Sequence, residues 1–249
     1  DLNQPDWDGE KVVMIPEIKT AYDAVAEAGL ICPDQSYEMG GMQLPLVVAS
    51  CAMGYITAAA STTNGFHALT AANANLLETH ASQDQIDTWV PRLRTGEFAG
   101  TMALSEPQAG SSLADMRTKA VAQDDGTYRI FGNKIWISGG DHELSSNIVH
   151  AVLARIEGAP PGVKGISMFI CPKFLLNEDG SVGARNDVQL AGLFHKMGGR
   201  GQTSTALNFG EGEGAVAYLV GEPHQGLRYM FHMMNEARVM VGTSGATLA

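Results

Sequence analysis

The sequence predicts an α+β protein with an N-terminal helical domain over residues 1–98, a central antiparallel β domain over 99–221, and the start of a C-terminal helical bundle over 222–249. Three observations predict this order. Apolar residues recur at helical spacing before residue 98, short β-type runs separated by Gly, Asp and Asn follow, and helical spacing returns after Gly221. No crossover helix separates the β runs, which favours antiparallel pairing.

The first expected helix has apolar residues at positions i, i+3, i+4 and i+7, namely Ile18, Ala21, Tyr22 and Val25, and Gly29 supplies a stop signal. Two further helices are expected over 46–60 and 66–78. Ser82 followed three residues later by Gln85 matches a capping box, which predicts that another helix begins there.

The clearest β signal is a pair of runs, 118–123 and 128–138, joined across Asp124-Asp125-Gly126. An Asp-Gly dipeptide supplies the positive φ that tight hairpins need, so we expect a hairpin, with an irregularity at Gly132. Further strands are expected over 147–155, 165–172, 203–209 and 215–219. After Gly221, one helix face is expected to carry Leu227, Met230, Phe231 and Met234.

Composition limits the function classes. Apolar residues make up 45% and charged residues 17%, which is typical of a folded globular chain. The net charge of -11, without Lys or Arg clusters, argues against nucleic-acid binding. Three scattered cysteines favour reduced thiols, and the residues from Asp1 to Trp7 do not form a signal peptide, so we expect a cytoplasmic protein. The apolar stretch 44–60 contains Ser50 and Thr57, which predicts a buried helix rather than a membrane span.

Two other motifs carry little weight. Glycines alternate with glutamates over 210–214, but the acidic residues would repel phosphates and no helix follows, so a dinucleotide fingerprint is not expected. His142 and Glu143 lack a second His at metal-binding spacing, so we expect no metal site.

Two strand ends carry the chemistry. Residues 100–111 form an expected strand that enters a Pro/Gly turn rich in hydroxyls, and residues 135–140 place Trp136 beside Ser138 and a double glycine. Each taken alone is more typical of an ordinary turn or a core Trp than of a ligand site. The functional interpretation is that exposed amides, hydroxyls and an aromatic wall contact a flat polar cofactor.

Together, the segments Met-Ala-Leu-Ser-Glu-Pro-Gln-Ala-Gly-Ser over 102–111 and Trp-Ile-Ser-Gly-Gly over 136–140 resemble the two flavin-contacting segments of the acyl-CoA dehydrogenase family. The resemblance extends through 89–97 and 196–205, and to Gly226-Leu227 and Arg238. It implies FAD as cofactor, with the contacting positions Met102, Leu104, Ser105, Gly110, Ser111, Trp136 and Ser138. The implied substrate-binding positions are Ser111, Asn235 and Arg238. Ser112 stands where many members have Asp.

The resemblance implies removal of an α-proton by a Glu, transfer of a β-hydride to flavin and formation of a trans-2-enoyl-CoA, with electrons passing to an electron-transfer flavoprotein. It also implies a homodimer or homotetramer. The sequence around Glu106 and Arg238 is similar to that of the branch that contains 3-methylmercaptopropionyl-CoA dehydrogenases. Two alternatives stay open: an acyl-CoA oxidase that uses oxygen, and a DNA-binding member of the same fold, although the acidic chain gives the latter no support.

No residue of the chain is assigned as the catalytic base. One branch of the family places its Glu directly before the matching Arg, but here Ala237 precedes Arg238 and Glu236 lies one residue earlier. A one-residue offset rotates a helical side chain by about 100°, so Glu236 is expected to point elsewhere. We therefore expect the base to lie outside these 249 residues.

Overall fold

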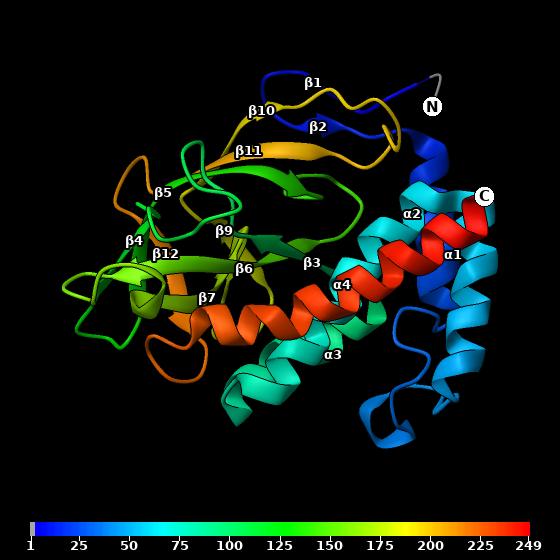
Figure 1. The fold of residues 1–249 in the computed structure, drawn as a ribbon, viewed down its shortest axis with the longest axis horizontal. Helices are drawn as coiled ribbons and strands as arrows, with labels where there is room; N and C mark the ends of the chain where they lie inside the picture. The colour runs from blue at the N-terminus through cyan, green and yellow to red at the C-terminus, as the bar shows by residue number, and fades with distance from the viewer. Residues whose placement is uncertain (1–2) are drawn as a thin grey trace.

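The computed structural model describes residues 3–249, so the first two of the seven residues tested for a signal peptide lie outside it. Figure 1 shows helices packed along one side of a twisted sheet. The helices are α1 (Pro16–Glu27), α2 (Leu46–His80), α3 (Gln83–Thr95) and α4 (Gly226–Leu248), with short 3-10 turns at Tyr37–Met39 and Val163–Gly165. This α+β arrangement confirms the predicted fold class.

Twelve strands are assigned in the described chain: β1 (Asp6–Trp7), β2 (Val12–Val13), β3 (Phe98–Ala103), β4 (Lys119–Ala122), β5 (Tyr128–Ser138), β6 (Asn147–Ile156), β7 (Ile166–Pro172), β8 (Phe174–Leu176), β9 (Val182–Arg185), β10 (Val188–Leu193), β11 (Ser204–Phe209) and β12 (Ala215–Leu219). The change from helix to strand falls between Thr95 and Phe98, and the return to helix falls between Leu219 and Gly226. The division into domains at 98 and 221 stays a prediction.

The two helices expected over 46–60 and 66–78 form one long helix, α2, with a kink at Ala60. Ala60 has φ -150° and ψ 63°, outside the helical region, so the hydrogen-bond ladder is interrupted there. The next helix, α3, begins with the predicted capping box: the Ser82 hydroxyl accepts from the Gln85 amide, and the Gln85 side chain accepts from the Ser82 amide.

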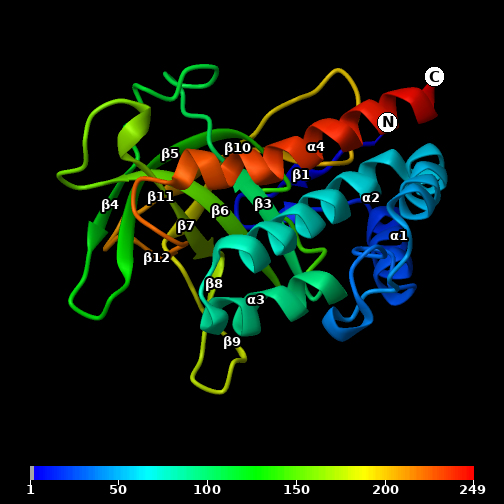
Figure 2. The ribbon, with the colours of Figure 1, turned by 60° about the horizontal axis from the view of Figure 1, so that its bottom comes forward.

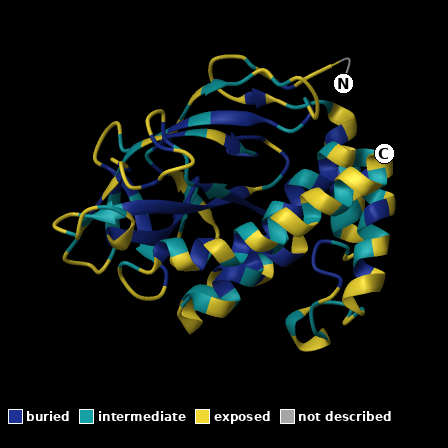
Figure 3. Ribbon diagram, in the orientation of Figure 1, coloured by how far each residue is buried: buried dark blue, intermediate teal, exposed yellow. Residues whose placement is uncertain are grey.

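The N-terminal half of α2 is helical as expected, but the expectation that it is buried is wrong. Leu46, Val47 and Tyr55 are 69%, 74% and 82% exposed, and only 17% of the most apolar window of this helix is buried. Figure 3 shows this contrast between the exposed start of α2 and its buried second half. By length and composition alone α2 could cross a membrane, and one such helix is weak evidence for a membrane span.

The main sheet has the order β10-β11-β5-β12-β7-β6-β3, and β4 pairs with both β5 and β6. Most pairs are antiparallel, as predicted. The pairs β3 with β6 and β4 with β6 are parallel, which the absence of crossover helices did not predict. The β3–β6 connection reverses direction through the β4–β5 hairpin instead of through a helix, so a parallel pair forms without one.

The hairpin between β4 and β5 forms as predicted. Gly126 has φ +82° in the turn, and Gly132 has φ +156°, a conformation that favours glycine. A Cβ at Gly132 would lie 2.4 Å from the Thr118 hydroxyl, so the strand also needs glycine there for space. The predicted irregularity is therefore a point of close approach between the two strands.

Two hydrophobic clusters cover opposite faces of the sheet, because successive residues of β6 alternate between them. The helix-side cluster includes Met230 and Met233 of α4, which are fully buried. Leu227 and Met234 pack on its edge, whereas Phe231, predicted on the same helix face, is 42% exposed. Tyr229 of α4 is buried in its place. Figure 2 shows α4 lying beside α2 above the sheet.

Asn73 of α2 fastens the helices to the sheet. Its Nδ2 atom donates to the Thr101 carbonyl of β3 at 3.2 Å and to the Val149 carbonyl of β6 at 2.9 Å. A Cβ on Gly100 would lie 2.6 Å from the Asn73 Cβ, so the helix reaches this depth only because residue 100 is a glycine. One buried amide therefore connects α2 to both strands of the parallel pair.

Candidate functional site

The two segments singled out by sequence lie side by side. The Ile135 amide of β5 donates to the Ser105 carbonyl just beyond β3 at 2.9 Å. Met102 lies on β3, whereas Trp136 and Ser138 lie at the end of β5. Residues more than thirty positions apart thus form one surface at the ends of two strands.

A buried ion pair between Glu106 and Lys134 holds this surface together. Lys134 Nζ donates to Glu106 Oε1 at 3.0 Å and to the Leu104 carbonyl at 2.9 Å, and both charged side chains are at most 2% exposed. The two Glu106 oxygens also accept from the amides of Arg117 and Thr118 at 2.7 and 3.0 Å. The pair therefore connects β5, the end of β3 and the following loop.

Both members of the pair are charged at neutral pH. Burial lowers the pKa of Lys134 to about 8, an effect that the attraction of Glu106 opposes. Burial alone would raise the pKa of Glu106, but Lys134 and the amides of Arg117 and Thr118 outweigh it, so the pKa of Glu106 lies below its ordinary value. The closed hydrogen-bond set offsets the cost of desolvating two charges.

The double glycine after β5 allows close packing behind the surface. Gly139 has φ +63°, and a Cβ there would lie 3.1 Å from the Phe66 ring of α2. A Cβ on Gly140 would lie 2.2 Å from the hydroxyl of Thr205 on β11. That hydroxyl donates to the Ile137 carbonyl at 3.0 Å. These contacts fix the end of β5 against α2 and β11.

Trp136 lies near the end of β5 and presents its ring to solvent. It has φ +59°, in the left-handed region, and is 57% exposed. Its ring contacts the Phe194 ring, with centroids 3.8 Å apart and planes 30° apart. An exposed Trp in a strained backbone conformation is uncommon and is often associated with a functional surface.

The hydroxyls of this surface are available to a ligand. Those of Ser105, Ser111 and Ser138 make no hydrogen bond within the part of the chain that the structure describes. Met102 and Leu104 are half-buried nearby, whereas Gly110 and Ser111 are exposed in the loop after β3. An aromatic ring, partly exposed apolar side chains and unpaired hydroxyls can together hold a flat heterocycle.

The predicted substrate positions occupy two places. Ser111 lies on the loop after β3, whereas Asn235 and Arg238 lie on α4. Arg238 Nη1 donates to Asn235 Oδ1 at 2.9 Å, and its guanidinium lies 5.6 Å from the Phe231 ring centroid. No hydrogen bond joins Ser111 to Asn235 or Arg238 among residues 3–249, so the structure does not link the three positions directly.

A cavity of about 490 Å³ lies between α2, α4 and the segment 31–34. Its lining is mostly apolar and includes Ala49, Met53, Ala68, Val239 and Met240. Asn235 and Glu236 also line it, so Glu236 faces this cavity and not empty solvent.

Glu236 is held at the cavity wall by two neighbours. Asn75 Nδ2 donates to its carboxylate at 3.2 Å, and His232 Nε2 lies 3.3 Å from Glu236 Oε1. Burial raises the pKa of Glu236, although Asn75 and His232 act in the opposite direction. A carboxyl group with a raised pKa beside an apolar cavity is a common feature of functional sites.

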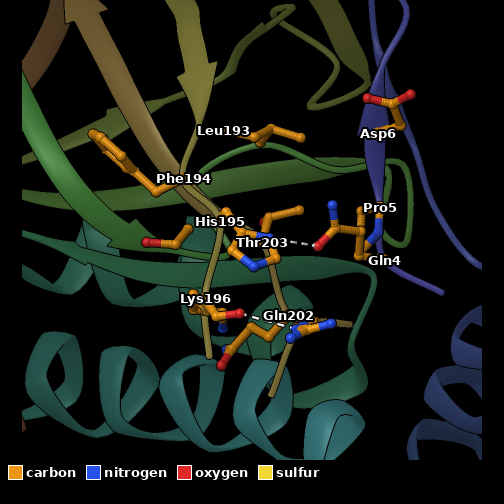
Figure 4. Close-up of a pocket in the computed structure, with 11 residues that line it drawn as sticks. Gln4, Pro5, Asp6, Leu193, Phe194, His195, Lys196, Gln202 and Thr203 are labelled. Atoms are coloured by element: carbon orange, nitrogen blue, oxygen red, sulfur yellow. Dashed lines mark hydrogen bonds between the residues drawn. The ribbon is translucent and has the colours of Figure 1, made fainter. Parts of the chain in front are cut away.

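A second, smaller cavity of about 150 Å³ opens beside Phe194 (Figure 4). The segment 193–204 lines one side and Gln4, Pro5 and Asp6 line the other. Phe194 also contacts Trp136, so this cavity adjoins the aromatic surface. Within residues 3–249, no group of three or more His, Cys, Asp or Glu residues could hold a metal ion.

Three residues that support the surface at the ends of β3 and β5 were not predicted from the sequence. Glu106 and Lys134 belong to or border the recognised segments, yet a Lys in a strand is expected to be exposed, so nothing local indicated their pairing. Phe194 lies at the end of β10, a strand that was not predicted. The only available signal was the position of Lys134 between apolar residues of one β run.

Comparison with known proteins agrees with this geometry. The family models described as the N-terminal and middle domains of acyl-CoA dehydrogenase match residues 3–97 and 101–211. The chain is 43% identical to 3-methylmercaptopropionyl-CoA dehydrogenase of Ruegeria pomeroyi over 95% of this chain and 40% of that protein. It is 39% identical to a butyryl-CoA dehydrogenase of Syntrophomonas wolfei over 94% of this chain and 39% of that protein.

Solved structures share the fold. An acyl-CoA dehydrogenase from Geobacillus kaustophilus matches with a TM-score of 0.75 and 24% identity, over 94% of this chain and 57% of that one. Butyryl-CoA dehydrogenase from Megasphaera elsdenii matches with a TM-score of 0.73 and 21% identity, over 91% and 56%. The chain spans about 40% of the length of the two curated relatives. On the two matched domain models and these identities, this chain belongs to the acyl-CoA dehydrogenase family.

Proposed function

We propose that the full-length protein uses FAD to dehydrogenate an acyl-CoA thioester to a trans-2-enoyl-CoA. The observation that carries the proposal is the joined surface at the ends of β3 and β5, where an exposed Trp136 and unpaired hydroxyls lie on a frame fixed by Glu106 and Lys134. The curated relatives named for acyl-CoA dehydrogenation support it.

The residues present fit a flavin. The Trp136 ring offers an apolar wall, and the hydroxyls of Ser105 and Ser138 can hydrogen-bond to the polar edge of a ring system. Met102 and Leu104 supply apolar contact, and Gly110 and Ser111 would complete the site. Bound FAD would supply acceptance of the hydride that leaves the β-carbon.

The cavity between α2 and α4 is the proposed place for the acyl chain. Its apolar lining suits a hydrocarbon or thioether chain, and Met53 and Met240 can adapt to different shapes. Asn235 and Arg238 are the proposed substrate contacts on α4. The names of the Ruegeria and Syntrophomonas relatives support a short acyl group, including a sulfur-bearing one, as substrate.

The remaining parts of the proposal concern the whole protein. The catalytic Glu lies outside the present 249 residues, and an electron-transfer flavoprotein takes the electrons. The protein forms a homodimer or homotetramer in the cytoplasm, and it binds neither nucleic acid nor a membrane. The net charge of -11 supports the absence of nucleic-acid binding, because phosphate contacts require clustered cations.

Anaerobic addition of a panel of acyl-CoAs to the full-length flavoprotein tests the proposal. We expect bleaching of the flavin absorbance with at least one short-chain member. Absence of bleaching with every acyl-CoA would refute dehydrogenation. Rapid peroxide formation in air would indicate an oxidase instead, and salt-dependent DNA binding would indicate the non-enzymatic alternative.

A further inference from the structure

The loop between β10 and β11 directs hydrogen-bond donors into the cavity shown in Figure 4. This loop carries the segment Lys196-Met197-Gly198-Gly199-Arg200, to which the proposed function assigns no role. His195, Lys196, Arg200 and Gln202 all line the cavity. Their side chains are an imidazole, an ammonium, a guanidinium and an amide, which all offer N–H groups.

Lys196 is the central observation. Its side chain is partly buried, and its ammonium has no ion pair or hydrogen bond with any residue from 3 to 249. Burial lowers the pKa of Lys196, which reports the loss of water around the charge. A partly desolvated cation without a partner is unfavourable, so an anion that occupies the cavity would relieve a cost already present in the fold.

Gln202 adds a second unpaired donor. Its Nε2 atom is buried and has no hydrogen-bond partner in the described chain. The amide group lies against α2, because a Cβ on Gly65 would be 2.7 Å from Gln202 Oε1 and 2.8 Å from Nε2. Buried amide donors in folded proteins are nearly always paired, so this orphan indicates a missing acceptor.

Two further side chains are already oriented. Arg200 Nε donates to the Lys196 carbonyl at 3.0 Å, which keeps the guanidinium beside the same turn. His195 Nδ1 lies 3.1 Å from Gln4 Oε1, so this nitrogen carries the proton. A contact within the loop and one to the N-terminal segment thus orient these side chains without a ligand.

The charge distribution favours an anion at one end. Asp6 is the acidic residue that lines the cavity, and Figure 4 shows it on the far side of Pro5 from Lys196. Asp6 Oδ1 accepts from the Trp7 amide at 2.8 Å. Within residues 3–249 Asp6 forms no ion pair with Lys196, so it does not neutralise the ammonium at that end of the cavity.

We propose that Lys196 and Gln202, with Arg200 and His195, form a subsite for a phosphate group. The cavity of about 150 Å³ is smaller than the roughly 300–1,000 Å³ of pockets that enclose a whole small molecule, so it suits one anionic group of a larger ligand or a small free anion. The N–H donors of Lys196, Gln202 and Arg200 match the several oxygens of a phosphate, and His195, whose Nδ1 is directed to Gln4, lines the same cavity.

The source of the phosphate depends on the proposed function. The cavity adjoins the Trp136 and Phe194 rings, beside the proposed flavin surface. A dinucleotide pyrophosphate and the 3′-phosphate of coenzyme A share the chemistry that this subsite recognises, as does inorganic phosphate. The test separates these three sources.

Full-length wild type is compared with Lys196→Met and Lys196→Gln, with Lys196→Arg as the charge-preserving variant and Lys164→Met as a control at an exposed lysine. Calorimetry measures affinity for coenzyme A, dephospho-coenzyme A and inorganic phosphate, and fluorescence measures FAD release. Circular dichroism melting verifies folding of each variant.

We expect both charge-removing variants to weaken one probe by about tenfold or more, the effect of losing one hydrogen bond to a charged group. Weakened coenzyme A binding with unchanged dephospho-coenzyme A binding identifies the 3′-phosphate, faster FAD release identifies the pyrophosphate, and weakened inorganic phosphate alone identifies a free ion. Lys196→Arg should retain most of the affinity.

Unchanged affinity for all three probes and unchanged FAD release in a folded charge-removing variant would overturn the subsite, as would an equal loss in Lys164→Met. The phosphate subsite and the proposed function can be refuted independently of each other. A protein that binds a phosphate probe through Lys196, yet is not bleached by any acyl-CoA, keeps the subsite and loses the dehydrogenase proposal.

Discussion

Replacing Lys134 by Met should destabilise the fold and weaken FAD binding together. The change removes a fully buried ammonium that donates to the Leu104 carbonyl and to Glu106. Glu106 would keep its charge and its bonds from the Arg117 and Thr118 amides, but its cationic partner would be gone. The segment 104–106, which carries Ser105, would lose two of its three hydrogen bonds to β5 and keep the one from the Ile135 amide.

Removal of one partner from a buried ion pair costs about 3–5 kcal/mol, because a buried charge is left uncompensated. That is a large share of the roughly 5–15 kcal/mol that stabilises a typical domain. The double variant K134M/E106Q should lose less free energy of unfolding than the sum of the losses in the two single variants, because the double variant contains no buried unpaired charge. Loosening of the Ser105 segment should also lower FAD affinity by about tenfold, equal to about 1.4 kcal/mol.

Urea denaturation of the full-length protein, followed by circular dichroism, gives the free energy of unfolding, and flavin fluorescence gives FAD affinity in the absence of urea. Arg94→Met is the matched control. Arg94 is 8% exposed and pairs with Glu78 of α2, and it also donates to the Met39 carbonyl at 2.8 Å, so its loss should destabilise the helices without touching the flavin surface.

A frame role for the Glu106–Lys134 pair is refuted if the free energy of unfolding of K134M lies within about 0.5 kcal/mol of wild type, the range of ordinary surface changes. It is also refuted if R94M lowers FAD affinity as much as K134M does, because the effect would then follow stability alone. A loss of FAD affinity confined to K134M would support a frame role for the ion pair.

Three other outcomes are expected. Glu236→Gln in the full-length protein should leave turnover mostly intact, because the base is expected elsewhere and Gln keeps the size of the side chain at the cavity wall; loss of turnover with flavin still bound would contradict this. Trp136→Ala should weaken FAD binding while the free energy of unfolding changes by less than about 1 kcal/mol, because the ring is 57% exposed; fluorescence titration and urea denaturation measure the two effects. Burial lowers the pKa of His142 and His150 to about 3, so the unfolded chain binds more protons below pH 6.5 and stability should fall as pH falls towards 3. Between pH 7 and pH 5 the loss should be about 2 kcal/mol per histidine by urea denaturation, and a flat profile would contradict the neutral, buried state.

Local signals predicted the elements that local chemistry determines. The Ser82 and Gln85 capping box, the Gly126 turn and the apolar spacing of α1 each lie within a few residues, and each forms as expected. The kink at Ala60 and the positive φ of Trp136 were not predictable, because both depend on what packs against them and neither residue type favours its conformation.

The pairing of distant strands could not be predicted from the sequence for the same reason. Thr101 pairs with His150 in the parallel β3–β6 ladder, and no local pattern specifies a partner so distant. The site residues came from a resemblance, which gave positions such as Ser105 and Trp136 but not what supports them. The burial of Lys134 could be found only from the packing around it, since lysine is among the residues least often buried.

The amide of Asn73 also bears on how this protein can be recombined with its relatives. A chimaera with a crossover near residue 98 would take Asn73 from one parent and Gly100 and Val149 from the other. A donor sequence with any larger residue at position 100 would collide with Asn73, and one without the Asn would leave two carbonyls of neighbouring strands unpaired. A crossover near residue 98, where the chain changes from helix to strand, is therefore unfavourable. Asn73 and Gly100 should be exchanged together.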